Sequence, residues 1–326
     1  MSVEIEAKLE KIPLINWLVA FLKKIKLPAL EGLSLYDLIE MYILGIVQGA
    51  LSARASAIAF SLFMALFPLL IFLVSLVPII VPYASVGNEN FDAQFLLFLE
   101  SFLPTATGEY FGEIYQQIKD QKSGGILSSA FFISIFLMAN GVNAIFGGFE
   151  HSYHIDLTRN FLRQYAYALM VGLILSVLLI IGAAAYVYFE FYIVDYLSEW
   201  AAKTRGYDLT ENDIVGAQIG KILFFVILSY LTTAILYYFG TAEGKQAKFF
   251  SVGALMTTIL FLLTSYLFGV YVEKFARYNE LYGALGGLLI LMVFIWLNSN
   301  ILLLGFELNA SLNTLRKNIN KNDSTE

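Results

Sequence analysis

The chain has 326 residues, of which 59% are hydrophobic and 14% are charged, and its mean hydropathy is +0.72. Soluble globular proteins are typically about 45–50% apolar and about 25% charged, so this composition indicates a membrane protein. Cysteine is absent, which excludes disulfides, thiolate metal ligands and thiol nucleophiles. The net charge of −6 says little about partners, because acidic and basic residues are sorted by segment.

Residues 1–53 are predicted to be cytosolic and interfacial. The apolar stretch Ile12–Leu22 has only 11 residues and is followed by lysines, which favours a helix lying on the membrane surface. From Leu35 onward, apolar residues recur at helical spacing and predict a second amphipathic helix. No cleavable signal peptide is expected, so the first spanning helix would serve as the insertion signal.

Six apolar runs then predict an all-α polytopic membrane protein whose transmembrane domain covers residues 54–312. In the last run, Gly283–Phe306, no charged residue occurs over 24 positions, or roughly 36 Å of helix. Pro68 should kink the first run and act as a hinge, and Pro78 and Pro82 should end it. The predicted spans are about 54–82, 125–146, 165–189, 216–239, 247–271 and 283–307.

The positions of lysine and arginine predict the topology. Of the 20 basic residues, 13 lie in the N-terminal region through Arg54, loop 147–164, connector 240–248 and the tail 313–326. Positive residues favour the cytosol, so both termini are expected there. The acidic loops 83–124 and 190–215 are expected outside, the first of them as short amphipathic helices.

Arg54 and Glu307 are the main candidate site residues. Arg54 opens the first spanning run and Glu307 closes the last, both at the predicted cytosolic end. Because an unpaired charge near hydrocarbon is costly, the hypothesis is an ion pair that locks the first helix to the last. The alternative is that each side chain extends separately to the lipid headgroups.

Polar and small residues inside the apolar runs suggest further contacts. The amides of Asn140, Asn143 and Asn300 would either line a polar substrate path or form hydrogen bonds between helices. Small residues one helical turn apart predict close helix packing. These packing glycines are Gly216, Gly220, Gly283 and Gly287.

Enzyme signatures are poor, and neither a catalytic residue nor a metal or other cofactor is predicted. The only histidines, His151 and His154, are three positions apart in loop 147–164, where a metal would need further ligands. Solvated loop histidines are the simpler interpretation. In the same loop, Arg159 and Arg163 could join Arg54 in attracting anionic phosphate headgroups.

Three stretches resemble the YihY/BrkB family of bacterial inner-membrane proteins. They are ARASAIAFSLFMALFPLLIFL (Ala53–Leu73), Asn143–Arg163, and YNELYGALGGLLILMVFIWLNSNILLLGFELNASL (Tyr278–Leu312). The resemblance implies six transmembrane helices in the bacterial cytoplasmic membrane and a role in envelope or lipid homeostasis. Some family members carry an older ribonuclease BN label, but the few scattered basic residues here disfavour a nucleic-acid partner.

The predicted function is therefore a transporter or lipid-handling protein for an amphipathic or anionic substrate, with membrane lipid as its partner. The alternative is a scaffold that binds partners through its outer loops, and a hydrolase is the third possibility. Neither the substrate nor the oligomeric state follows from the sequence.

Overall fold

The structure is a computed structural model that describes residues 21, 23–24, 34–84, 129–155, 158–188, 211–244, 248–275 and 284–323. These residues form helices and no β-strand, and six of the helices are long and apolar enough to cross a membrane. The all-α, six-span prediction is confirmed. The helices are α3 (Leu35–Gln48), α4 (Leu51–Ala84), α7 (Ser129–Glu150), α8 (Phe161–Tyr188), α10 (Glu211–Gly240), α11 (Val252–Phe275) and α13 (Ala284–Asp323).

Helix ends differ from the predicted spans by a few residues, with one larger difference at the C-terminus. Helix α13 does not end near residue 307 but continues to Asp323, so most of the predicted tail is helical. The reason is that Ala310 and Leu315 continue the buried face of the helix beyond Glu307. Helix α4 runs through Pro68, Pro78 and Pro82 to Ala84, so the prolines do not end it at the predicted place, and the hinge role of Pro68 stays a prediction.

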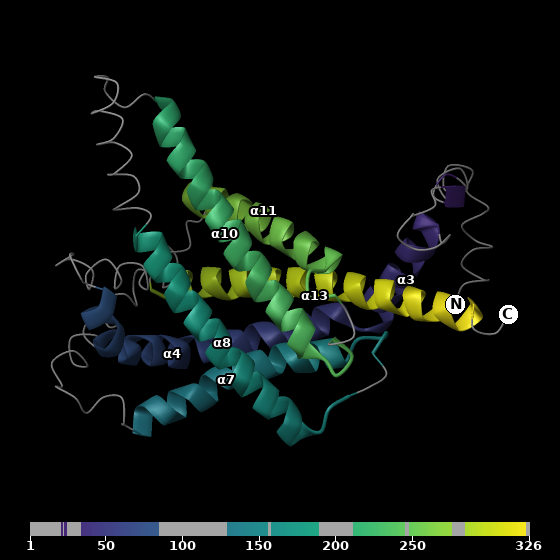
Figure 1. Cartoon of the computed structure of the whole chain (residues 1–326), viewed down its shortest axis with the longest axis horizontal. Helices are drawn as coiled ribbons and strands as arrows, with labels where there is room; N and C mark the ends of the chain where they lie inside the picture. Colours follow the sequence, from purple (N-terminus) through teal and green to yellow (C-terminus); the bar gives the residue numbers. More distant parts are fainter. Residues whose placement is uncertain are drawn as a thin grey trace.

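Successive contacts between the six spanning helices close into a ring, and in Figure 1 α10 slopes away from α13 toward the top of the view. Helix α4 packs on α7, and the ring continues through α8, α10, α11 and α13 back to α4. Helix α3, the predicted second amphipathic helix, lies outside the ring against α13. A left-handed residue, Ala50 with φ 46°, turns the chain between α3 and α4. The predicted surface helix Ile12–Leu22 and the two outer loops fall outside the described residues.

The hydrophobic core is concentrated at one end of the ring, which we call the packed end. There the rings of Phe149 and Phe306 stack with centroids 4.2 Å apart, and Tyr237 meets both edge-on. Six helices supply this core: its members include Leu51, Ala55 and Ile58 from α4, Val142, Ile145 and Phe146 from α7, Ala168 and Val171 from α8, Ala234 from α10, Ala254 from α11, and Leu302, Leu303 and Ala310 from α13. The beginning of α4, the α7–α8 loop and the α10–α11 connector therefore meet at the packed end.

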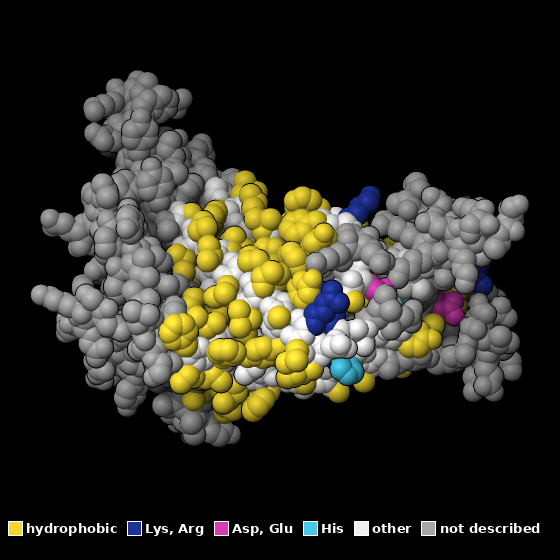
Figure 2. Space-filling model, turned by 60° about the horizontal axis from the view of Figure 1, so that its bottom comes forward, with side chains coloured by type: hydrophobic (Ala, Val, Ile, Leu, Met, Phe, Trp, Pro, Cys, Tyr) yellow, Lys and Arg dark blue, Asp and Glu magenta, His cyan; other side chains and the backbone are white. Residues whose placement is uncertain are grey.

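The outer surface of the ring is apolar, as a lipid-facing surface must be. Figure 2 shows hydrophobic side chains gathered in a broad band, with basic and histidine side chains beside it. Large exposed side chains include Ile133 at 56%, Ile227 at 57% and Tyr266 at 71% of their full exposure. Such a surface would be an aggregation hazard in water, whereas hydrocarbon solvates it.

Helices α11 and α13 approach each other closely at Gly253 and Gly305. A Cβ atom on Gly253 would lie 2.1 Å from the Gly305 carbonyl oxygen, so only glycine fits there. This pair was not among the predicted packing glycines. Of those, Gly220 and Gly287 are half-buried, while Gly283 and the surroundings of Gly216 lie outside the described part of the chain.

Candidate functional site

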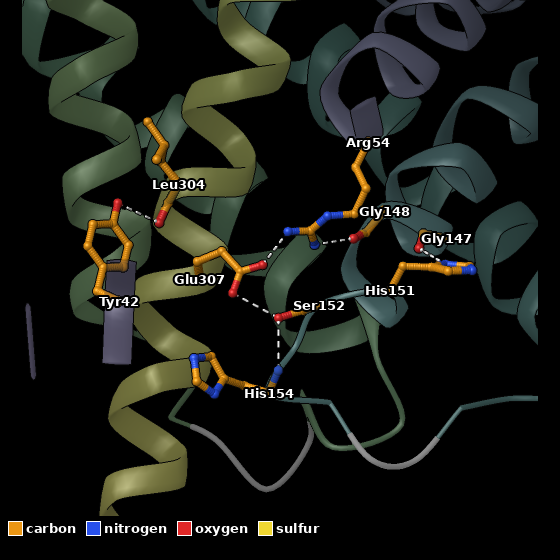
Figure 3. A network of polar contacts seen from close by, with 9 residues as sticks. All are labelled: Tyr42, Arg54, Gly147, Gly148, His151, Ser152, His154, Leu304 and Glu307. Atoms are coloured by element: carbon orange, nitrogen blue, oxygen red, sulfur yellow. Dashed lines mark hydrogen bonds and ion pairs between the residues drawn. The ribbon is translucent and has the colours of Figure 1, made fainter. Parts of the chain in front are cut away.

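The first and last spanning helices are joined by a buried ion pair at the packed end (Figure 3). Arg54 Nη2 of α4 donates to Glu307 Oε1 of α13 over 2.5 Å. The two side chains are only 8% and 0% exposed, so neither extends separately to the membrane surface. This contact confirms the predicted ion pair. A charge buried this deeply requires such a partner.

The loop after α7 completes this polar site. The carbonyl oxygen of Gly148 accepts from Arg54 Nη1 at 2.8 Å, and Ser152 Oγ donates to Glu307 Oε2 at 2.8 Å. The backbone N–H of His154 donates in turn to Ser152 Oγ at 3.4 Å. Each carboxylate oxygen therefore has a donor, and the network joins α4, α13 and the α7–α8 loop. We call these side chains, with Gly148, the Arg54–Glu307 network.

Helix α3 reaches the same region through Tyr42. Its hydroxyl donates to the Leu304 carbonyl oxygen over 3.1 Å, three residues before Glu307 on α13. Burial, together with the negative charge of Glu307, raises the pKa of Tyr42 to about 12. The phenol therefore stays protonated at physiological pH and remains a donor to α13.

Arg159 lies at a different place, the C-terminal end of α10. Its guanidinium donates to the carbonyl oxygens of Phe239, at 2.7 Å, and Thr241, and it stacks over the Tyr167 ring at 4.3 Å. Burial lowers the pKa of Arg159, while the nearby Glu150 carboxylate opposes this shift. A cation on the last carbonyls of a helix stabilises the negative end of its dipole. Arg159 thus ties the α7–α8 loop to α10.

Replacing Arg159 by glutamine is expected to lower the free energy of unfolding by about 1–3 kcal/mol, because two carbonyl acceptors lose a charged donor. Thermal and SDS unfolding in detergent would measure the loss. Arg163→Gln is the matched control, because the Arg163 side chain is exposed. Equal losses for the two variants would contradict the contribution assigned to the Arg159 contacts.

The other predicted site residues do not join the Arg54–Glu307 network. The amide of Asn300 donates to the Trp296 carbonyl oxygen of its own helix at 2.8 Å. Asn140 lies exposed on α7. The side-chain oxygen of Asn143 is buried and has no hydrogen-bond partner in the described structure. The amides therefore do not form one continuous polar path with Arg54 and Glu307.

Two contacts between helices were not predicted from the sequence. Asn309 of α13 accepts the Gly253 N–H at 2.8 Å and donates to Ser251 Oγ at 2.8 Å, which caps the start of α11. Tyr237 of α10 donates to the Leu302 carbonyl oxygen at 2.7 Å, deep in the core. Asn309 belongs to the Glu-Leu-Asn-Ala sequence in the third stretch that resembles the family. The family resemblance therefore already marked Asn309 as a residue of interest.

The two histidines are separate from any cluster of metal-ligating side chains within the described ranges. His151, just after α7, bonds the Gly147 carbonyl oxygen of that helix through Nδ1 at 2.7 Å, and the backbone N–H of His154 donates to Ser152 Oγ. No group of three or more histidine, aspartate or glutamate side chains that could hold a metal lies in the described segments.

These features define a polytopic α-helical membrane protein with a buried polar network at one end. A family model, Virulence factor BrkB, matches residues 44–326, and the chain belongs to this family. The resemblance found in the three sequence stretches is thereby confirmed.

Several proteins are similar to this chain over most of their own length. The ribonuclease-like protein YfkH of Bacillus subtilis is 25% identical over 81% of this chain and 91% of its own. A UPF0761 membrane protein of Coxiella burnetii is 26% identical over 77% of this chain and 84% of its own. A UPF0761 membrane protein of Aggregatibacter aphrophilus is 27% identical over 82% of this chain and 89% of its own. No solved structure gives a significant match.

Proposed function

We propose that this protein is a transporter or lipid-handling protein for an amphipathic or anionic substrate in the bacterial cytoplasmic membrane. The packed end would be its closed gate, facing the cytosol. The observation that carries the proposal is the buried ion pair between Arg54 of the first spanning helix and Glu307 of the last.

An ion pair suits a contact that must open. A buried ion pair is often no more stabilising than well-packed apolar side chains of similar volume, so stability alone does not explain it. Apolar side chains resist separation in the presence of water, whereas arginine and glutamate can each be hydrated once they part. The network also joins α4 and α13 at the seam where the ring of helices closes.

The distribution of buried side chains supports a gate at this end. The core cluster draws on all six spanning helices near the Arg54–Glu307 network. Parting Arg54 from Glu307 would open this end between α4 and α13.

The surface of the packed end favours an anionic amphipathic substrate. Arg163 in the first turn of α8 and Lys248 on the α10–α11 connector are both exposed there. Large apolar side chains are exposed beside them, including Leu162 at 80% and Phe250 at 65%. Cationic groups next to apolar surface match the charged headgroup and acyl chains of an anionic lipid.

The test is lipid movement in proteoliposomes. Fluorescent phosphatidylglycerol and phosphatidylcholine would be compared by dithionite quenching, with empty liposomes as the baseline. The expected result is faster transbilayer movement of phosphatidylglycerol than of phosphatidylcholine, and a further change in rate for Glu307→Gln. Rates equal to the baseline for both lipids in both proteins would contradict lipid movement. A scaffold role through the outer loops, which lie outside the described residues, would then be the alternative.

A further inference from the structure

Helix α7 presents an exposed polar side chain within its apolar span. Asn140 is exposed and lies between Phe132 and Glu150, the two ends of that span. Among the described residues its amide has no hydrogen bond, unlike Asn298 and Asn300, whose amides donate to carbonyls of their own helix. The carbonyl one turn before Asn140, that of Phe136, already accepts from the Tyr165 hydroxyl at 2.7 Å.

An unpaired amide in hydrocarbon is unfavourable, because no water is present to satisfy it. The same face of α7 carries large apolar side chains at helical spacing from Asn140. Ile133, Phe136 and Leu137 are 56%, 55% and 44% exposed, respectively. This surface, which we call the Asn140 face, combines one hydrogen-bonding group with apolar contacts, as helix–helix interfaces in membranes do.

We propose that the Asn140 face is a symmetric interface with a second copy of this chain. An amide is both donor and acceptor, so two Asn140 side chains related by a two-fold axis can satisfy each other. Two copies inserted in the same orientation place Asn140 at the same depth, and the axis then runs along the membrane normal. A different protein would need its own polar group at this depth, whereas a second copy has one by construction.

Disulfide cross-linking in native membranes tests this proposal, since the chain has no cysteine of its own. Leu137→Cys keeps the amide and places one thiol next to the proposed axis. A cross-linked species of twice the monomer mass is expected after oxidation. The matched control is Ile227→Cys on α10, which is more exposed than Leu137, at 57% against 44%, and should give only background. Equal yields from the two positions would overturn the proposal.

The contribution of the amide is tested separately by counting subunits with single-molecule photobleaching in lipid at low protein density. Asn140→Leu is expected to weaken self-association about three- to thirty-fold, and Asn140→Gln should retain more of it. Because Asn140 is exposed, neither change disturbs the core. A monomeric wild-type protein, or a dimer unaffected by Asn140→Leu, would overturn the proposed role of the amide.

Discussion

Replacing Glu307 by alanine is expected to lower the free energy of unfolding by about 3–5 kcal/mol. The change leaves the Arg54 guanidinium buried without its carboxylate, and it removes the acceptor of the Ser152 hydroxyl. Arg54→Ala should have a loss of similar size, because Glu307 is fully buried. Equilibrium unfolding in mixed detergent micelles would measure both.

The control for this prediction is Asn298→Leu, on the same helix. The Asn298 amide donates only to the Phe294 carbonyl oxygen, one turn away on α13, so its loss should cost little. If Glu307→Ala were no more destabilising than Asn298→Leu, the ion pair would not hold the packed end together.

Replacing Gly253 by alanine is expected to prevent α11 from docking on α13. The new Cβ would lie 2.1 Å from the Gly305 carbonyl oxygen and 2.6 Å from the Asn309 amide. Relief requires moving the backbone of one helix, and that movement breaks the Asn309 cap of α11. We expect a loss of more than about 3 kcal/mol, beyond the usual range for overpacking.

Gly269→Ala on the same helix is the matched control, because a Cβ there would meet no atom within 4 Å. It should be neutral or stabilising by about 0.5–1 kcal/mol, since alanine is the better helix former. Yield and melting temperature of the two variants in detergent would be compared directly. Similar behaviour would show that α11 and α13 do not meet at Gly253.

The part of the fold that follows from hydrophobic length was predictable from the sequence. The six spans needed only apolar runs long enough to cross a bilayer. The pairing of Arg54 with Glu307 was also predictable, because two opposite charges at the same depth of neighbouring helices have few other partners. The end of α13 does not follow from the charge at Glu307, because the buried stripe of the helix continues past this residue to Leu315.

Contacts that depend on the rotation and register of packed helices could not be predicted. Gly253 and Gly305 lie on different helices, and nothing in their local sequence shows that they face each other. Ser152 was hidden for a related reason, because its place beside Glu307 depends on the path of the α7–α8 loop. Arg159 was predicted to attract headgroups by charge alone, yet this loop directs it to the end of α10.

The most direct test of a lock between the first and last helices is a charge exchange. Arg54→Glu, Glu307→Arg and the double variant would be compared with the wild type by unfolding in detergent. The account predicts that each single variant is strongly destabilised, with two like charges in one buried site, and that the double variant recovers a substantial part of the loss. Losses that simply add in the double variant would show that Arg54 and Glu307 do not interact.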